Sequence, residues 1–111
     1  MKVYLDSKLP APEGWVSCGL LNEGLEHLKT RKVTHLSLDP DMGDDRTGTG
    51  YDALLWIESA VVQGNFHPPV ITVHAVNPVH VASKMKRMIE IIKIRHDCIH
   101  NPQPDKYQKG D

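Results

Sequence analysis

The chain has 111 residues, of which 40% are hydrophobic and 24% charged, a length and composition typical of one globular domain with a single core. Its formal net charge of −1 gives no electrostatic basis for general binding to nucleic acid or to a membrane surface. No apolar run is long enough to span a bilayer, and Cys18 and Cys98 lack the spacing of a metal site or a disulfide framework. We therefore expect a reduced, cytoplasmic protein.

Short alternating apolar runs are interleaved with longer runs that have helical spacing. In chain order, they predict strands at residues 2–6 and 15–18, a helix at 20–30, a strand at 32–39, a helix at 51–63, a strand at 70–76 and a helix at 79–96. The β-branched run VITVHAV favours a central strand. Strands that alternate with helices indicate a mainly parallel sheet in a small three-layer α/β domain. We expect this domain to span residues 1–97, followed by a polar tail at residues 98–111.

Polar side chains stand at the carboxyl ends of three predicted strands. Asp6 ends the first strand, Asp39 ends the third, and Asp41 follows two residues later, while His74 and Asn77 stand near the end of the last strand. In α/β proteins, ligands bind outside these strand ends. Asp6 and Asp39 are therefore candidate ligands for Mg²⁺ or Mn²⁺, which prefer carboxylate, water and phosphate oxygens. The open alternative is that these acids only cap strand ends and form Asx turns.

His74 and Asp41 are the candidate catalytic residues. A neutral imidazole near its ordinary pKa can act as a general acid or base, although a histidine in an apolar strand can also be a core residue with one satisfied nitrogen. Asn77 could donate its amide to a phosphate oxygen or simply form the turn before Pro78.

The stretch TGTGYD resembles a turn that holds phosphate at the N-terminus of a helix. Its residues Thr47, Gly48, Thr49 and Gly50 are candidate substrate-binding residues. The stretch lacks the Lys-Ser/Thr pair of a P-loop, which excludes an ATPase of that type. Alternatively, Thr49 or Asp52 only caps the helix.

Several segments together are similar to the cyclic-phosphate-processing receiver domains: KVYLD, PEGW, LSLDPD, TGYDALLWIE and FHPPVITVHAVNP. The similarity covers residues 2 to about 92. It implies a receiver- or flavodoxin-like fold, and it implies action on, or binding of, nucleotides or RNA ends with a cyclic phosphate in bacterial conflict and RNA-repair systems. A metal-assisted phosphoesterase is the activity that this resemblance suggests.

The family's site residues match this sequence by position. Its first-strand acid matches Asp6, its Asp-His-Asp matches Asp39-Pro40-Asp41, and its late histidine and asparagine match His74 and Asn77.

The sequence departs from the family pattern at three places. Ser7 replaces a second acid, Lys8 and Leu9 stand where an arginine is common, and Pro40 replaces the middle histidine. These departures keep open a non-catalytic module that binds a nucleotide or a protein.

Two other functions have weaker support. A phosphorelay receiver needs an acidic pair on the first strand and a lysine after the last one, and neither is present in Asp6-Ser7 or in VITVHAV. The segment HDCIH, with His96, Cys98 and His100, has a spacing that could chelate a soft divalent metal, but such clusters in chain ends usually bind metal adventitiously.

Overall fold

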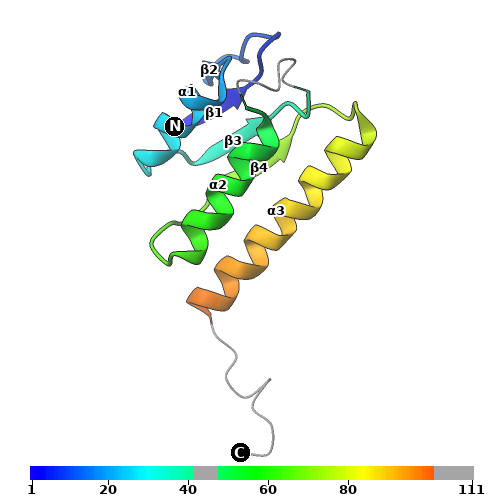
Figure 1. Ribbon diagram of the computed structural model, residues 1–111. Helices are drawn as coiled ribbons and strands as arrows, with labels where there is room; N and C mark the ends of the chain where they lie inside the picture. The colour runs from blue at the N-terminus through cyan, green and yellow to red at the C-terminus, as the bar shows by residue number, and fades with distance from the viewer. Residues whose placement is uncertain (42–47, 102–111) are drawn as a thin grey trace, which may run out of the picture.

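The computed structural model describes residues 1–41 and 48–101. These residues form a four-stranded, all-parallel sheet and three helices (Figure 1). The strands are β1 (Lys2–Leu5), β2 (Val16–Cys18), β3 (His35–Leu38) and β4 (Val70–Val73), and the helices are α1 (Leu21–Lys29), α2 (Gly50–Val62) and α3 (Val79–His100). The expected α/β class and the parallel, receiver-like sheet are confirmed.

The strands are arranged in the order β2-β1-β3-β4. Leu5 of β1 pairs with Leu38 of β3, which pairs in turn with Val73 of β4. Within the described residues β4 is thus an edge strand, and Val70 is 59% exposed. The expectation of a central strand was wrong because β-branched residues suit any pleated, half-buried surface and do not specify a place in the sheet.

All three described helices pack on one face of the sheet. The alternate residues Val3, Leu5, Leu36 and Leu38 are fully buried and belong to one core cluster with side chains from α1, α2 and α3. Figure 1 shows α2 and α3 side by side in front of the sheet. The described part of the chain therefore has two layers rather than the expected three. No helix lies in the connection between β1 and β2, so the opposite face has no helix from that connection to cover it.

Helix α3 continues to His100, four residues beyond its expected end at residue 96. Residues 102–111, most of the expected tail, lie outside the described residues. None of the described helices combines the length and the apolar character needed to cross a membrane.

Candidate functional site

Three of the predicted site residues come directly after three neighbouring strands. Asp6 follows β1, Asp39 follows β3 and His74 follows β4. Their backbone N–H groups extend the sheet ladder by donating to the carbonyls of Cys18, Leu5 and Leu38, at 2.9, 3.0 and 3.0 Å. The ladder therefore holds the three residues in adjacent, equivalent positions at one edge of the sheet.

Their side chains converge as the sequence predicted. One ligand atom from each of Asp6, Asp39 and His74 lies within 4.8 Å of the others. Asp6 is 4% exposed and Asp39 is 7% exposed, so both carboxyl groups are buried. They border a pocket of about 250 Å³, here called the acidic pocket, which is lined by Tyr4, Asp6, Lys8, Leu9, Asp39, Asp41, His74, Ala75 and Asn77.

Asp6 is held by three hydrogen bonds. Its Oδ1 accepts from the backbone N–H groups of Lys8 at 2.8 Å and Leu9 at 2.9 Å, and its Oδ2 lies 2.9 Å from Nε2 of His74. Burial raises the pKa of the Asp6 carboxyl, but these hydrogen bonds outweigh burial and lower the pKa below its ordinary value. Asp6 is therefore an ionised, oriented carboxylate at neutral pH.

The pKa of Asp39 is shifted in the opposite direction. Burial raises the pKa of its carboxyl, and the nearby charge of Asp6 raises it further. The N–H of Asp41 donates to Oδ1 of Asp39 at 3.0 Å and offsets part of this effect. Two buried carboxylates this close together repel each other, so a cation between them would stabilise both ionised forms.

The His74 ring is fixed on three sides. Its Nδ1 lies 2.8 Å from Oγ of Ser37, and the Tyr4 ring stacks on it with centroids 4.0 Å apart and planes 11° apart. Thr72 donates its hydroxyl to Ser37 at 3.3 Å. When the hydroxyl of Ser37 donates its proton to Nδ1, the ring proton is on Nε2 and is donated to Asp6. In this tautomer the neutral His74 ring is hydrogen-bonded at both nitrogens.

Ser37 and Tyr4 were not singled out in the sequence. Ser37 alternates with Leu36 and Leu38, and Tyr4 alternates with Val3 and Leu5, so both side chains point to the face that the helices leave uncovered. This alternation, combined with a histidine at the end of a neighbouring strand, is the signal that could have identified them.

Asp41, Lys8 and Asn77 line the outer part of the acidic pocket. Nζ of Lys8 lies 3.3 Å from Oδ2 of Asp41, and the two side chains are 61% and 51% exposed. Asn77 is also exposed and precedes Pro78 through a cis peptide bond. The predicted catalytic Asp41 and the predicted substrate-binding Asn77 therefore lie beside the same pocket as Asp6, Asp39 and His74.

The described residues of the predicted phosphate turn do not line the acidic pocket. Thr47 is outside the described residues, and Gly48, Thr49 and Gly50 are not among the residues that line the acidic pocket. Thr49 caps α2: its N–H donates to Oδ2 of Asp52 at 2.8 Å, and its Oγ1 accepts from the N–H of Asp52 at 3.4 Å. The capping alternative is thus realised, and phosphate contact by these residues stays a prediction.

The two glycines of this turn allow close packing. Gly48 has a φ of 94°, and a Cβ there would lie 2.3 Å from Cδ2 of Leu21. A Cβ on Gly50 would lie 2.9 Å from the carbonyl oxygen of Asp39. Gly48 therefore allows the turn to pack against Leu21 of α1, and Gly50 allows the start of α2 to pack against the backbone of Asp39.

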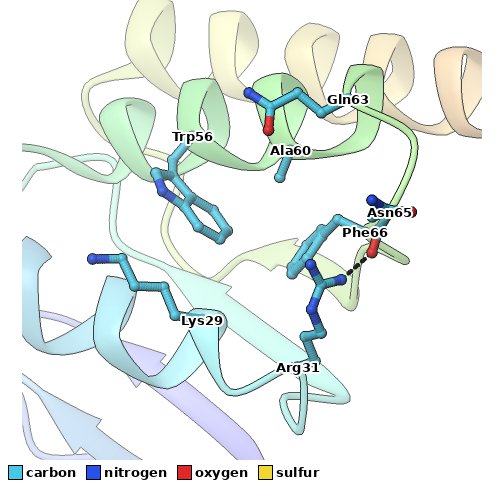
Figure 2. A pocket seen from close by; sticks show the side chains of 7 residues that line it. All are labelled: Lys29, Arg31, Trp56, Ala60, Gln63, Asn65 and Phe66. Atoms are coloured by element: carbon cyan, nitrogen blue, oxygen red, sulfur yellow. Dashed lines mark hydrogen bonds between the residues drawn. The ribbon is translucent and has the colours of Figure 1, made fainter.

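A second pocket, of about 210 Å³, lies between the end of α1, α2 and the loop after α2 (Figure 2). It is lined by Lys29, Arg31, Trp56, Ala60, Gln63, Asn65 and Phe66. Figure 2 shows Arg31 directed to Asn65, whose carbonyl accepts its hydrogen bond. Among the described residues, the lining of this pocket contains no carboxylate and no imidazole, so the acidic pocket is the better candidate for metal binding and acid–base chemistry.

A sequence model of the cyclic-phosphate processing receiver domain matches residues 1–91. The chain belongs to this family. The match includes the entire lining of the acidic pocket of this receiver domain. No curated protein and no solved structure matched the chain.

Proposed function

We propose that this receiver domain binds Mg²⁺ or Mn²⁺ in the acidic pocket and hydrolyses a cyclic phosphate ester on a nucleotide or an RNA end. The observation that carries the proposal is the in-register convergence of Asp6, Asp39 and His74 beside a pocket. The family's description supports cyclic phosphate as the substrate class.

The side chains present fit such an ion. Two carboxylates supply the hard oxygen ligands that Mg²⁺ and Mn²⁺ prefer, and a cation between them would relieve the repulsion that raises the pKa of Asp39. Asp39 accepts the N–H of Asp41 at Oδ1, and its carboxylate borders the acidic pocket. When bound, a divalent ion would neutralise phosphate charge and lower the pKa of a coordinated water.

The other side chains of the pocket would transfer protons and contact the phosphate. His74 would exchange a proton with the substrate at Nε2, because Nδ1 faces the buried hydroxyl of Ser37. Asp41, at the exposed edge, would accept a proton from the attacking water, and Lys8 and Asn77 would contact phosphate oxygens. In the overall reaction, the water oxygen forms a bond to phosphorus, one ester P–O bond breaks, and the leaving oxygen takes a proton to give a monoester.

A non-catalytic nucleotide-binding module is the second candidate, and two departures from the family pattern favour it. Ser7 supplies no second carboxylate beside Asp6, and the buried Pro40 supplies no imidazole between Asp39 and Asp41. In this alternative the acidic pocket binds the nucleotide without hydrolysing it.

The test is a calorimetric titration of Mg²⁺ and Mn²⁺ into the wild-type protein and Asp39→Asn, with and without a 2′,3′-cyclic nucleotide. Phosphorus NMR of the same mixtures then detects the monoester product. Glu26→Gln is the matched charge control, because Glu26 is exposed and pairs only with Lys29 on the surface of α1 among the described residues.

The enzyme proposal expects metal binding in the wild type and Glu26→Gln, at least about tenfold weaker binding in Asp39→Asn, and product only where metal binds. Binding of metal and nucleotide without product with either ion would favour the non-catalytic module. A folded wild-type protein that binds neither metal nor nucleotide would refute both candidates.

A further inference from the structure

A cluster of three histidines lies at the end of the sheet opposite to the acidic pocket. His67 belongs to the loop between α2 and β4, three residues before the N-terminal end of β4, and His96 and His100 lie in the last turns of α3. One ring nitrogen from each residue lies within 4.8 Å of the others. The three rings are in mutual contact, with centroids 4.3–5.0 Å apart.

The geometry points to a transition-metal site: we propose that His67, His96 and His100 bind one Zn²⁺ ion through their ring nitrogens. A tetrahedral zinc with Zn–N distances of about 2.0–2.1 Å holds its ligand nitrogens roughly 3.3 Å apart. Nδ1 of His67 already lies 3.0 Å from Nε2 of His96. His96 and His100, spaced i and i+4, share one face of the helix and can chelate the same ion.

The loop presents His67 in a restricted geometry. Phe66, the preceding residue, is 4% exposed and packs edge-on against Trp56 with ring centroids 5.3 Å apart. Pro68 and Pro69 follow directly and limit the backbone of the loop. A ligand between a buried anchor and two prolines loses little freedom when it binds a metal, which favours affinity.

The electrostatics of the cluster suit a divalent cation. The C-terminal end of α3 carries the negative end of the helix dipole, which stabilises a cation.

Three imidazoles without a carboxylate select zinc and similar transition metals over Mg²⁺. Three protein ligands also leave the fourth position of zinc open to water or to an external ligand. Cys98 is not part of this group: it lines an apolar groove with Val62, Ile91, Ile94 and Ile99. The helix and the loop, rather than the HDCIH segment alone, form the site.

The experiment uses the untagged, EDTA-treated full chain, titrated with Zn²⁺ by calorimetry and with Co²⁺ by visible absorption. The variants are His67→Ala and His100→Ala, each compared with His80→Ala, a control that removes an exposed histidine of α3 outside the cluster. Asp39→Asn is included so that binding in the acidic pocket can be subtracted.

The expected result is one Zn²⁺ per chain after binding in the acidic pocket is subtracted, a tetrahedral Co²⁺ spectrum, and Zn²⁺ affinity reduced at least about tenfold by His67→Ala and by His100→Ala. His80→Ala and Asp39→Asn should keep this binding. In histidine-selective ¹⁵N NMR, Zn²⁺ should shift the ring signals of His67, His96 and His100. If all variants bound Zn²⁺ with equal affinity, or if the wild type bound it only at millimolar concentration, the binding would be adventitious and the proposal would be overturned.

Discussion

Nε2 of His74 lies 2.9 Å from Oδ2 of Asp6, although 68 residues separate the two in the chain. The contact joins the end of β4 to the end of β1 across the intervening β3, and so passes beside Asp39. Together with the Ser37 hydroxyl, it sets the orientation of the imidazole in the pocket. The stability of the domain should therefore depend on pH through the carboxyl groups of Asp6 and Asp39, whose pKa values are shifted in opposite directions.

Asp6→Asn should destabilise the domain by about 1.5–3 kcal/mol at pH 7, because a carboxylate with several hydrogen bonds becomes an amide whose NH₂ group opposes the Nε2 proton of His74. The lowered pKa of Asp6 means that its contribution is present above the ordinary value of 3.8 and is lost as the pH falls through the folded-state pKa. Urea unfolding at pH 7 and at about pH 3 measures this. If the free energies of unfolding of the variant and the wild type differed by the same amount at both pH values, the stabilising role of the ionised Asp6 carboxylate would be contradicted.

Asp39→Asn should have the opposite effect in the absence of metal. Because burial raises the pKa of Asp39, its favourable contribution is present only at low pH and is lost as the pH rises through the folded-state pKa. At pH 7 the asparagine variant should unfold at a higher temperature than the wild type, with roughly 4–8 °C for each kcal/mol gained. Differential scanning calorimetry in EDTA tests this, and Glu26→Gln should leave the transition unchanged. A lower Tm for Asp39→Asn would refute the idea that its ionised carboxylate costs stability.

Ser37→Ala should cost about 1 kcal/mol of stability and change which ring nitrogen of His74 carries the proton. The variant removes the group within 2.8 Å of Nδ1, and it also leaves the Thr72 hydroxyl without the acceptor it has now. Histidine ¹⁵N NMR should show the tautomer of His74 shift from one dominant form to a mixture. Ser83→Ala, an exposed change on α3, serves as the control, and a His74 spectrum that is the same in both variants would exclude a positioning role for Ser37.

Gly50→Ala should destabilise the domain by about 1–3 kcal/mol through overpacking. Its Cβ would lie 2.9 Å from the carbonyl oxygen of Asp39 and 3.0 Å from Cε of Met85. The methionine side chain can move, but the backbone of Asp39 is held by the sheet ladder. The substitution should therefore also displace Asp39 and weaken metal binding by its carboxylate. Gly19→Ala is the matched control, because its Cβ would meet only Oε1 of Glu23 at 4.0 Å. Equal chemical-denaturation midpoints for the two variants would contradict this reasoning.

The sequence predicted the parallel sheet and the positions of Asp6, Asp39 and His74 for one physical reason. Apolar alternation locates each strand, and the first polar residue after it marks the carboxyl end of that strand. In a parallel sheet these ends lie at one edge, so the residues that follow different strands are expected there even when the side-chain packing is unknown. The family match covers residues 1–91, which include these three positions.

What could not be predicted depends on contacts between distant segments. The role of Ser37 requires the register of β3 against β4, and the His67 cluster requires the loop after α2 to reach the end of α3. The described residues also lack the expected third layer because the β1–β2 connection contains no helix, and a short polar connection does not reveal this in the hydropathy pattern.

The attachment of Asp6, Asp39 and His74 to the sheet ladder has a consequence for the motions of the domain. Their amide protons are bonded to neighbouring strands, two of them to the central strands β1 and β3. Such protons exchange with solvent only when the sheet itself opens, whereas those of exposed loops exchange through small local fluctuations. The base of the acidic pocket should therefore belong to the most slowly exchanging unit of the protein, and a ligand would meet it already assembled rather than induce it.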